Sequence, residues 1–281
     1  AQQTPRRIGL VNLAQMTQGQ GDAALQALQG QDRPVVMLDV ADPVSQREAG
    51  RLVWQQRGQG VFSASSSGLQ YALVEYWRSR GWLPALSSLP QAQPLPCIAV
   101  VSGSCSPMSA AQIEWAEHNG FLTERLDVAK CLDAAQAEQE IERLVVLAAD
   151  AVSRQVSPVI YSARGPQDPA VTGFDALVKR AGCEKSEATE RIGMALAEVM
   201  RRLLDRTALR RIVVAGGDSS GAVASHLDIQ AFTVAAGMAP GVPLCRAWSD
   251  NPRRDGLEIA LKGGQLGAVS FYGDVRAGRV G

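Results

Sequence analysis

Residues 216–221, which read Gly-Gly-Asp-Ser-Ser-Gly, are the part of this sequence best suited to chemistry. They join the apolar run 212–215 to a stretch with helical spacing. Two kinds of site use such a segment. A serine hydrolase presents its nucleophile on a tight Gly-x-Ser-x-Gly turn between a strand and a helix. A phosphate-binding site instead uses glycines to bring main-chain N–H groups close to an anion at the start of a helix.

The hydrolase interpretation needs a histidine within hydrogen-bonding distance of Ser219. The sequence contains two histidines, His118 and His226, and only His226 follows Ser219 in the order serine, acid, histidine. His226 belongs to the same predicted helix as Ser219 and lies about 10 Å further along its axis, at about 1.5 Å per residue. A serine hydrolase that uses Ser219 is therefore the least favoured of the functions considered.

The phosphate interpretation assigns a role to each residue of the segment. Gly216 and Gly217 let the backbone turn sharply beside an anion, and Ser219 and Ser220 supply main-chain N–H groups at a helix N-terminus. Asp218 fits if a divalent metal lies between its carboxylate and the phosphates, or if it orients a water or hydroxyl group. The simpler alternative is a strand-to-helix turn whose Asp and Ser residues only cap the helix. The motif alone does not separate these two interpretations.

Two further turns have the same character. Residues 102–107 read Ser-Gly-Ser-Cys-Ser-Pro, and residues 261–267, Leu-Lys-Gly-Gly-Gln-Leu-Gly, follow the apolar run 257–260. Turns at the carboxyl ends of parallel strands can converge on one crevice, so the three together predict a nucleotide site. The sequence has neither Gly-x-x-x-x-Gly-Lys-[Ser/Thr] nor a Gly-x-Gly-x-x-Gly that opens a helix after a strand. A P-loop NTPase and an ordinary dinucleotide-binding dehydrogenase are thus disfavoured.

The elements that must position these turns alternate along the chain. We expect strands at 8–11, 34–40, 60–66, 97–105, 121–128 and 158–164. We expect helices at 21–29, 43–57, 68–81, 107–120, 134–155 and 186–207. Strands separated by helices of this length predict βαβ units around a parallel sheet, and hence the α/β class.

Two local signals refine this pattern. Ser186, with Thr189 and Glu190 close behind it, is expected to cap the helix 186–207 through a capping box. After residue 227 few helices are expected, and the chain is predicted to form strands and glycine turns that fold back on the sheet.

The segment 83–96 is rich in Pro, Ser and Gln and has no periodicity, which favours a linker over a long surface loop. We therefore predict two α/β domains, 1–88 and 89–281. The apolar stripe on residues 68–77 suits either a core or a homodimer interface.

Composition excludes several classes of function. The chain has 281 residues, of which 46% are hydrophobic, and 28 basic residues balance 28 acidic ones. This balance argues against a nucleic-acid partner, which would need a clustered basic face. No apolar run approaches the roughly 20 residues that span a bilayer, and the N-terminus lacks the apolar segment of a signal peptide. The five cysteines form no Cys-x-x-Cys pair, so we expect a reduced, cytoplasmic protein without a zinc site.

Four motifs in fixed order carry a resemblance to a known family. They are SGSCSPMSAAQI (102–113), VVAGGDSSGAV (213–223), MAPGVPLCRA (238–247) and ALKGGQLGAVSFY (260–272). They resemble the nucleotide-binding C-terminal domain of the four-carbon acid sugar kinase family, which includes 3-oxo-tetronate, threonate and erythronate kinases. SASSSGLQYAL (63–73) resembles the end of that family's N-terminal substrate domain. The resemblance covers nearly the whole chain.

The resemblance implies ATP-dependent phosphorylation of a hydroxyl group on a small sugar acid. We expect Mg²⁺ to bridge the phosphates, with Asp218 as the candidate metal ligand and catalytic residue, which helps to hold the metal or orients the acceptor. The family's usual threonine after the acidic residue is Ser219 here, which keeps the hydroxyl, and its usual Lys-Ser-Gly is Lys-Gly-Gly at 262–264. The ATP-binding residues that it implies are Ser102, Ser104, Gly216, Gly217, Asp218, Ser219, Ser220, Lys262, Gly263 and Gly264.

One departure from the family bears on activity. Family members begin with an Asp-Asp-x-Thr-Gly-Ala motif in a long substrate-binding segment, and this sequence lacks that motif. The abrupt start on Arg-Arg-Ile-Gly-Leu-Val favours truncation, with 1–88 as the C-terminal part of the sugar-acid-binding domain. Because substrate positioning supplies much of phosphoryl-transfer catalysis, a nucleotide-binding module without catalysis is the alternative to a kinase.

Overall fold

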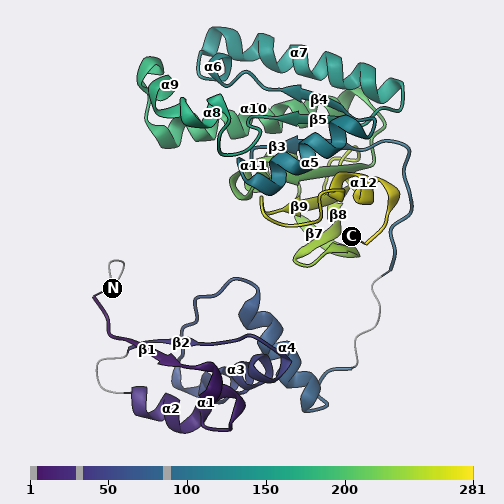
Figure 1. The fold of residues 1–281 in the computed structure, drawn as a ribbon. Helices are drawn as coiled ribbons and strands as arrows, with labels where there is room; N and C mark the ends of the chain where they lie inside the picture. The colour runs from purple at the N-terminus through teal and green to yellow at the C-terminus, as the bar shows by residue number, and fades with distance from the viewer. Residues whose placement is uncertain (1–4, 30–33, 85–89, 281) are drawn as a thin grey trace. The chain divides into compact units, whose positions relative to one another are not determined.

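The computed structural model describes residues 5–29, 34–84 and 90–280. The chain divides into two units, Ala1–Ser88 and Leu89–Gly281 (Figure 1). Each unit has its own hydrophobic core. The part of the predicted linker at 85–89 lies outside the described residues. The linker residues that follow, 90–96, contact the rest of the second unit: Leu95 N donates to Arg276 O, and the buried Arg211 donates to Gln93 O.

The first unit contains a two-stranded parallel sheet with helices on one face. Val11, Met16, Ala49, Leu52 and Ala72 form its core. The opposite face of the sheet leaves the side chains of alternate strand residues exposed, which are Ile8, Leu10, Val35 and Met37. The elements are β1 (Ile8–Val11), α1 (Leu13–Thr17), α2 (Gly21–Leu28), β2 (Val35–Leu38), α3 (Pro43–Gln56), η1 (Arg57–Gln59) and α4 (Gly68–Ser79).

The strand predicted at 60–66 is wrong. The chain leaves η1 through Gly60, whose φ is +70°, and residues 61–65 form no regular structure. Phe62 in this stretch is 91% exposed. A strand is stable only where a neighbour takes up its main-chain hydrogen bonds. Here the hydroxyl of Ser65 instead accepts from Leu69 N and helps to start α4.

The second unit is built on a seven-stranded sheet of order β4-β5-β3-β6-β9-β8-β7. The first five strands in that order are parallel, β8 runs antiparallel to β9, and the edge strand β7 runs antiparallel to β8. This confirms the α/β class and the strands that fold back on the sheet. The strands are β3 (Ala99–Ser102), β4 (Leu122–Arg125), β5 (Pro158–Tyr161), β6 (Arg211–Ala215), β7 (Ala231–Ala239), β8 (Val242–Trp248) and β9 (Glu258–Lys262).

Helices cover both faces of this sheet (Figure 1). Alternate residues of one strand point to opposite faces, so Ala99 and Val101 pack under α7 and α10 whereas Ile98 and Val100 pack under α5 and α12. The helices are α5 (Pro107–His118), α6 (Val128–Cys131), α7 (Ala134–Ser153), α8 (Pro169–Thr172), α9 (Phe174–Ala181), α10 (Lys185–Arg206), α11 (Gly217–His226) and α12 (Phe271–Ala277).

The capping box predicted at Ser186 is also wrong. α10 begins at Lys185 with Glu184 at the N-cap, so Ser186 lies inside the helix. The hydroxyl of Thr189 donates to Lys185 O at 2.9 Å, within the helix, and does not take part in a capping box. Among the described helices, none is long and apolar enough to cross a membrane.

Candidate functional site

The three glycine- and serine-rich turns meet at one edge of the seven-stranded sheet. β3, β6 and β9 are adjacent and parallel, and their last residues are in register, Ser102 beside Ala215 and Ala215 beside Lys262. The turns that follow these strands therefore leave the sheet side by side, as the sequence predicted. They enclose a pocket of about 450 Å³ lined by Gly103, Ser104, Cys105, Ser106, Pro107, Gly216, Gly217, Asp218, Ser219, Gly264 and Gln265.

Main-chain hydrogen bonds continue the sheet into the turns. Gly103 N donates to Ala215 O at 3.0 Å, and Gly216 N donates to Lys262 O at 2.9 Å. Each bond joins the first turn residue after one strand to the last residue of the next strand. The pocket walls are thus held by the same hydrogen-bond ladder that holds the sheet.

Two positions in the walls require glycine. A Cβ on Gly103 would lie 1.9 Å from Ser219 Oγ, so the serine hydroxyl occupies the space that a larger residue would need. Gly216 has φ +118° and ψ 137°, a conformation that L side chains rarely adopt. These glycines let the turns after β3 and β6 approach each other closely.

The N-terminus of α11 opens into this pocket. Gly216 is its N-cap, and no side chain in the described part of the chain caps it. Ser220 Oγ donates back to Gly216 O at 2.6 Å and so does not cap the first-turn amides. The interpretation in which Asp and Ser residues only cap the helix is therefore disfavoured. The free amides and the helix dipole suit an anion.

The structure separates the ten predicted site residues into two groups. Those that line the pocket are Ser104, Gly216, Gly217, Asp218, Ser219 and Gly264. Those outside its lining are Ser102, Ser220, Lys262 and Gly263. Ser102 and Lys262 are the last residues of their strands, and both are at least 99% buried. Gly103, Cys105, Ser106, Pro107 and Gln265 line the pocket although they were not predicted as site residues; they belong to the turns already quoted.

Lys262 is a buried cation. Its Nζ donates to Gly264 O at 3.3 Å, and among the described residues no carboxylate pairs with it. Burial alone lowers the pKa of the Lys262 ammonium to about 8. A buried charge of this kind is costly unless an anion compensates it. The position of Lys262 beside the glycine turn therefore favours a negatively charged ligand.

Asp218 is the one carboxylate in the pocket lining, and it is exposed. In the described ranges no group of three or more His, Cys, Asp or Glu side chains could hold a metal. Magnesium is commonly bound by one or two carboxylates together with phosphate oxygens and water. The donor set fits a metal that arrives with a phosphorylated ligand, and does not fit a metal held by protein alone.

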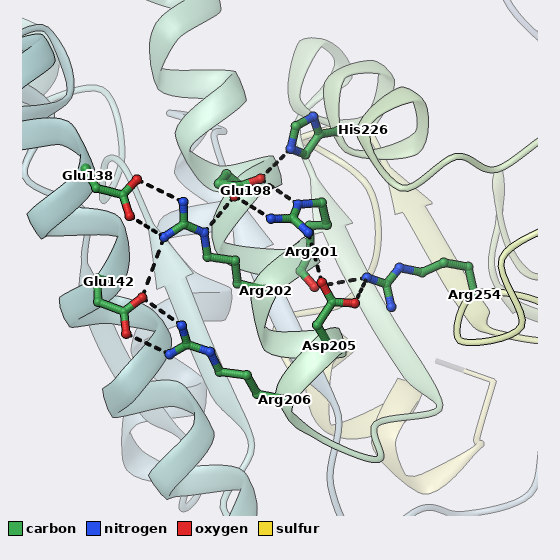
Figure 2. Close-up of polar contacts among 9 residues, drawn as sticks. All are labelled: Glu138, Glu142, Glu198, Arg201, Arg202, Asp205, Arg206, His226 and Arg254. Carbon is green, nitrogen blue, oxygen red and sulfur yellow. Dashed lines mark hydrogen bonds and ion pairs between the residues drawn. The ribbon is translucent and has the colours of Figure 1, made fainter.

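Neither histidine lies in the pocket lining. His226 Nε2 is 2.6 Å from Glu198 Oε2, at the far end of α11 (Figure 2). His118 Nδ1 faces Glu114 O at 2.8 Å within α5. A general base for Ser219 is therefore missing from the described residues around it, and the serine hydrolase interpretation fails on geometry.

A network of ion pairs ties α11 to α10, and α10 in turn to α7 (Figure 2). Glu198 accepts from His226, Arg201 and Arg202. The hydrogen bond from Arg201, followed by those from His226 and Arg202, holds the pKa of the Glu198 carboxyl well below its ordinary value. Further pairs in the network are Arg202 with Glu138, Arg206 with Glu142 and Arg254 with Asp205. The network fixes the end of α11 opposite the pocket.

A second pocket, of about 830 Å³, lies at the carboxyl end of β4. Its charged side chains are largely paired with one another, as Arg143 is with the buried Glu140. Arg125 forms two hydrogen bonds with Asp168, each of 2.7 Å. Burial by itself raises the pKa of the Asp168 carboxyl, but bonds from Arg125 and from two main-chain amides lower it to about 2. These pairs account for most of the charged side chains that line this pocket.

Two family models match the chain, one in each unit. A family model described as a nucleotide-binding C-terminal domain matches residues 99–272, and one described as a sugar-binding N-terminal domain matches residues 1–73. A 3-oxo-isoapionate kinase of Paraburkholderia graminis is 56% identical over 280 residues, which are 100% of this chain and 60% of that protein. A 3-oxo-tetronate kinase of Salmonella typhimurium is 33% identical over 217 residues, 76% of this chain and 46% of that protein.

Solved structures share the fold. A Salmonella typhimurium protein, provisionally described as a tRNA synthase, has a TM-score of 0.68 at 26% identity, over 98% of this chain and 60% of that one. A Haemophilus influenzae protein of the DUF1537 family has a TM-score of 0.57 at 21% identity, over 96% of this chain and 60% of that one. The chain thus spans 60% or less of the length of each of these relatives.

Proposed function

The chain belongs to the four-carbon acid sugar kinase family, and from this premise we propose that it carries the nucleotide site of an ATP-dependent sugar-acid kinase. The observation that carries the proposal is the pocket at the ends of β3, β6 and β9, into which the uncapped N-terminus of α11 opens. Main-chain amides at such an end bind phosphate groups. The Lys262 ammonium nearby supplies a compensating charge.

The predicted residues have proposed roles either in the pocket lining or in support of it. The turn 216–220 binds the phosphates through main-chain N–H groups, and Ser104 and Gly264 form the facing walls. Asp218 holds Mg²⁺ or orients the hydroxyl that is phosphorylated; when bound, Mg²⁺ neutralises charge on the transferred group. Ser102, Ser220 and Gly263 support the turns from outside the lining, a smaller role than direct contact with ATP.

The substrate we favour is a 3-oxo sugar acid of the isoapionate type. The relative named as a 3-oxo-isoapionate kinase is 56% identical to this chain, whereas that named as a 3-oxo-tetronate kinase is 33% identical. We expect the residues that select the acid to belong mostly to the sugar-binding domain. The model of that domain matches residues 1–73 of this chain. A 3-oxo-tetronate, threonate or erythronate remains the second choice.

A nucleotide-binding module without catalysis is the alternative function. The chain spans 60% of the length of its 3-oxo-isoapionate kinase relative, and sugar positioning supplies much of the catalysis in such enzymes. A homodimer through the stripe 68–77 is likewise a proposal; the buried Ala72 on this helix packs in the first unit's own core, whereas Tyr71 is exposed.

Calorimetric titration of the 281-residue chain with ATP and ADP in the presence of Mg²⁺ tests the site. We expect binding with one nucleotide per chain, weakened at least several-fold by Asp218→Asn when Mg²⁺ is present and little changed when it is chelated. Absence of nucleotide binding would sink the proposal. Labelling of Ser219 by a fluorophosphonate would support the serine hydrolase interpretation instead.

Kinase assays separate the two remaining functions. Phosphate transfer from ATP to 3-oxo-isoapionate and to 3-oxo-tetronate is measured with this chain and with a protein of the relatives' full length. Transfer by the longer protein alone would mean that this chain is a binding module, and a preference for 3-oxo-tetronate would reverse our choice of substrate.

A further inference from the structure

The carbonyl oxygen of Gly264, in the pocket wall, faces three hydrogen-bond donors. Ser106 Oγ donates at 2.6 Å, Ser109 Oγ at 3.1 Å and Lys262 Nζ at 3.3 Å. A carbonyl oxygen has two lone pairs, which the two hydroxyl groups fill. The bond from Lys262 is the longest of the three. If the Lys262 bond breaks, the carbonyl oxygen of Gly264 therefore still has two hydrogen-bond donors.

Gln112 holds the continuation of the same turn. It is fully buried, and its Nε2 faces Ala268 O at 2.9 Å, Leu266 O at 3.1 Å and Gly267 O at 3.4 Å. Because all three partners are acceptors, the nitrogen of the amide, and not its oxygen, must point toward them.

Ser106, Ser109 and Gln112 follow one another at intervals of three residues along the start of α5, and so share one face of that helix. We call these three residues the α5 clamp. The clamp binds the turn 264–268 at four carbonyl oxygens: the two serine hydroxyls share Gly264 O, and the two N–H groups of Gln112 are shared among the other three. The turn lies between the end of β9 at Lys262 and the start of α12 at Phe271, and its own main-chain hydrogen bonds run from Leu266 N to Gly263 O and from Phe271 N to Ala268 O, each 3.1 Å. The side chains of the clamp add to these local bonds.

Two members of the clamp act from outside the pocket. Ser109 and Gln112 are fully buried and do not line it, whereas Gly264 and Gln265 do. Any effect of Ser109 or Gln112 on a ligand must therefore pass through the position of the turn or through the freedom of Lys262.

We propose that Ser109 and Gln112 are positioning residues for nucleotide binding. They keep the turn 264–268 in the shape that forms the pocket wall, and the serine hydroxyl satisfies Gly264 so that the Lys262 ammonium is free to turn toward phosphate. This inference rests on the proposed nucleotide site and adds to it two residues that touch no ligand.

The test compares variants of the 281-residue chain that remove donors from the clamp. Gln112→Met keeps the approximate size of the side chain without a donor, and Ser109→Ala removes one hydroxyl. Asn119→Ala is the matched control, because Asn119 is the C-cap residue of the same helix and its side chain donates to a single carbonyl there, Trp115 O. We measure the Kd for ADP with Mg²⁺ by calorimetry and the amide hydrogen exchange of residues 264–268.

We expect Gln112→Met to weaken ADP binding about tenfold and Ser109→Ala about threefold, each the loss of roughly one hydrogen bond. Exchange should accelerate at 264–268 but not in β6, and Asn119→Ala should leave both quantities unchanged. Gln112→Glu adds a pH readout. Its carboxylate cannot donate, but its protonated form can, so ADP affinity relative to the unsubstituted chain should recover as the pH falls toward 5.

The outcomes separate this inference from the proposed function. If the unsubstituted chain fails to bind ADP, the nucleotide site and the inference both fall. If it binds ADP, and Gln112→Met and Ser109→Ala accelerate exchange at 264–268 without changing the Kd, the nucleotide site stands and the positioning role is wrong. Should Gln112→Met not fold, Ser109→Ala decides alone.

Discussion

The hydroxyl of Ser219 lies where a side chain on Gly103 would begin. A Cβ on Gly103 would be 1.9 Å from Ser219 Oγ and 3.2 Å from Ser219 Cβ. Gly103 follows β3 and Ser219 lies in the first turn of α11, so this one contact joins two of the three turns that form the pocket.

Gly103→Ala should displace Ser219 and, with it, the amides at the start of α11. Overpacking of this kind costs about 1–3 kcal/mol of stability. We expect ADP affinity to fall about tenfold and the urea midpoint of unfolding to drop. Gly221→Ala is the control, because a Cβ there meets nothing within 4 Å and Ala favours a helix. Adding Ser219→Ala to Gly103→Ala should recover part of the stability; no recovery would show that the contact is not the cause.

Lys262→Met should change stability and ligand binding in opposite directions. The variant removes a buried ammonium that no carboxylate among the described residues compensates, so the free energy of unfolding should rise. The same change removes the cation beside the glycine turn, so ADP affinity should fall at least tenfold. Equilibrium unfolding in urea and calorimetry with ADP measure the two quantities. A variant that loses stability would contradict this account of Lys262.

The pH dependence of stability should report Lys262 as well. Burial lowers its pKa to about 8 from an ordinary 10.5, so between these values the unfolded chain binds a proton that the folded chain has lost. The free energy of unfolding therefore rises with pH over this window, by up to about 3 kcal/mol from this group. The rise should be smaller by that amount in Lys262→Met, measured by urea unfolding from pH 7.5 to 10.

Asp168→Asn should lower the free energy of unfolding at neutral pH but not near pH 2. The folded-state pKa of Asp168 is about 2 against an ordinary 3.8, so its contribution is present above pH 4 and is lost as the pH falls toward 2. At pH 7 the variant should be destabilised by about 2 kcal/mol. Asp175→Asn, which breaks the exposed pair with Lys185, should have little effect. Equal losses for the two variants in thermal unfolding would contradict the prediction.

Glu198→Gln should loosen α11 from the helix beneath it. Glu198 accepts from His226, Arg201 and Arg202 through both carboxylate oxygens, and glutamine keeps one neutral acceptor oxygen and replaces the other with a donor NH2 group (Figure 2). We expect a loss of about 1–2 kcal/mol and faster amide exchange in α11. Glu187→Gln, which breaks one exposed pair with Arg191 on the same helix, is the control. Exchange in α11 that stays unchanged would mean that the network does not hold this helix.

The sequence was sufficient to predict the features that depend on the residues of one short segment. Strands β3 and β6 are short apolar runs that end in small residues, and the helices after them begin where Pro107 or paired glycines permit it. The class of the second unit and the character of each turn followed from that pattern. Predictions from local residue preference were wrong where contacts with other segments determine the structure. Residues 60–66 have the composition of a strand but pair with no strand, and Ser186 precedes an apolar stripe but lies inside α10.

The sequence indicated that the three turns could converge, but only the tertiary structure decided how they meet and which side chains line the pocket. β3, β6 and β9 are far apart in the chain, and their adjacency results from sheet pairing, which no local pattern encodes. The same pairing buries Ser102 and Lys262 below the pocket and leaves Ser104 in its wall. The role of Gln112 depends on carbonyls more than 150 residues away in the sequence. Residue types and turns are properties of short segments, whereas contacts between segments depend on packing of the whole unit.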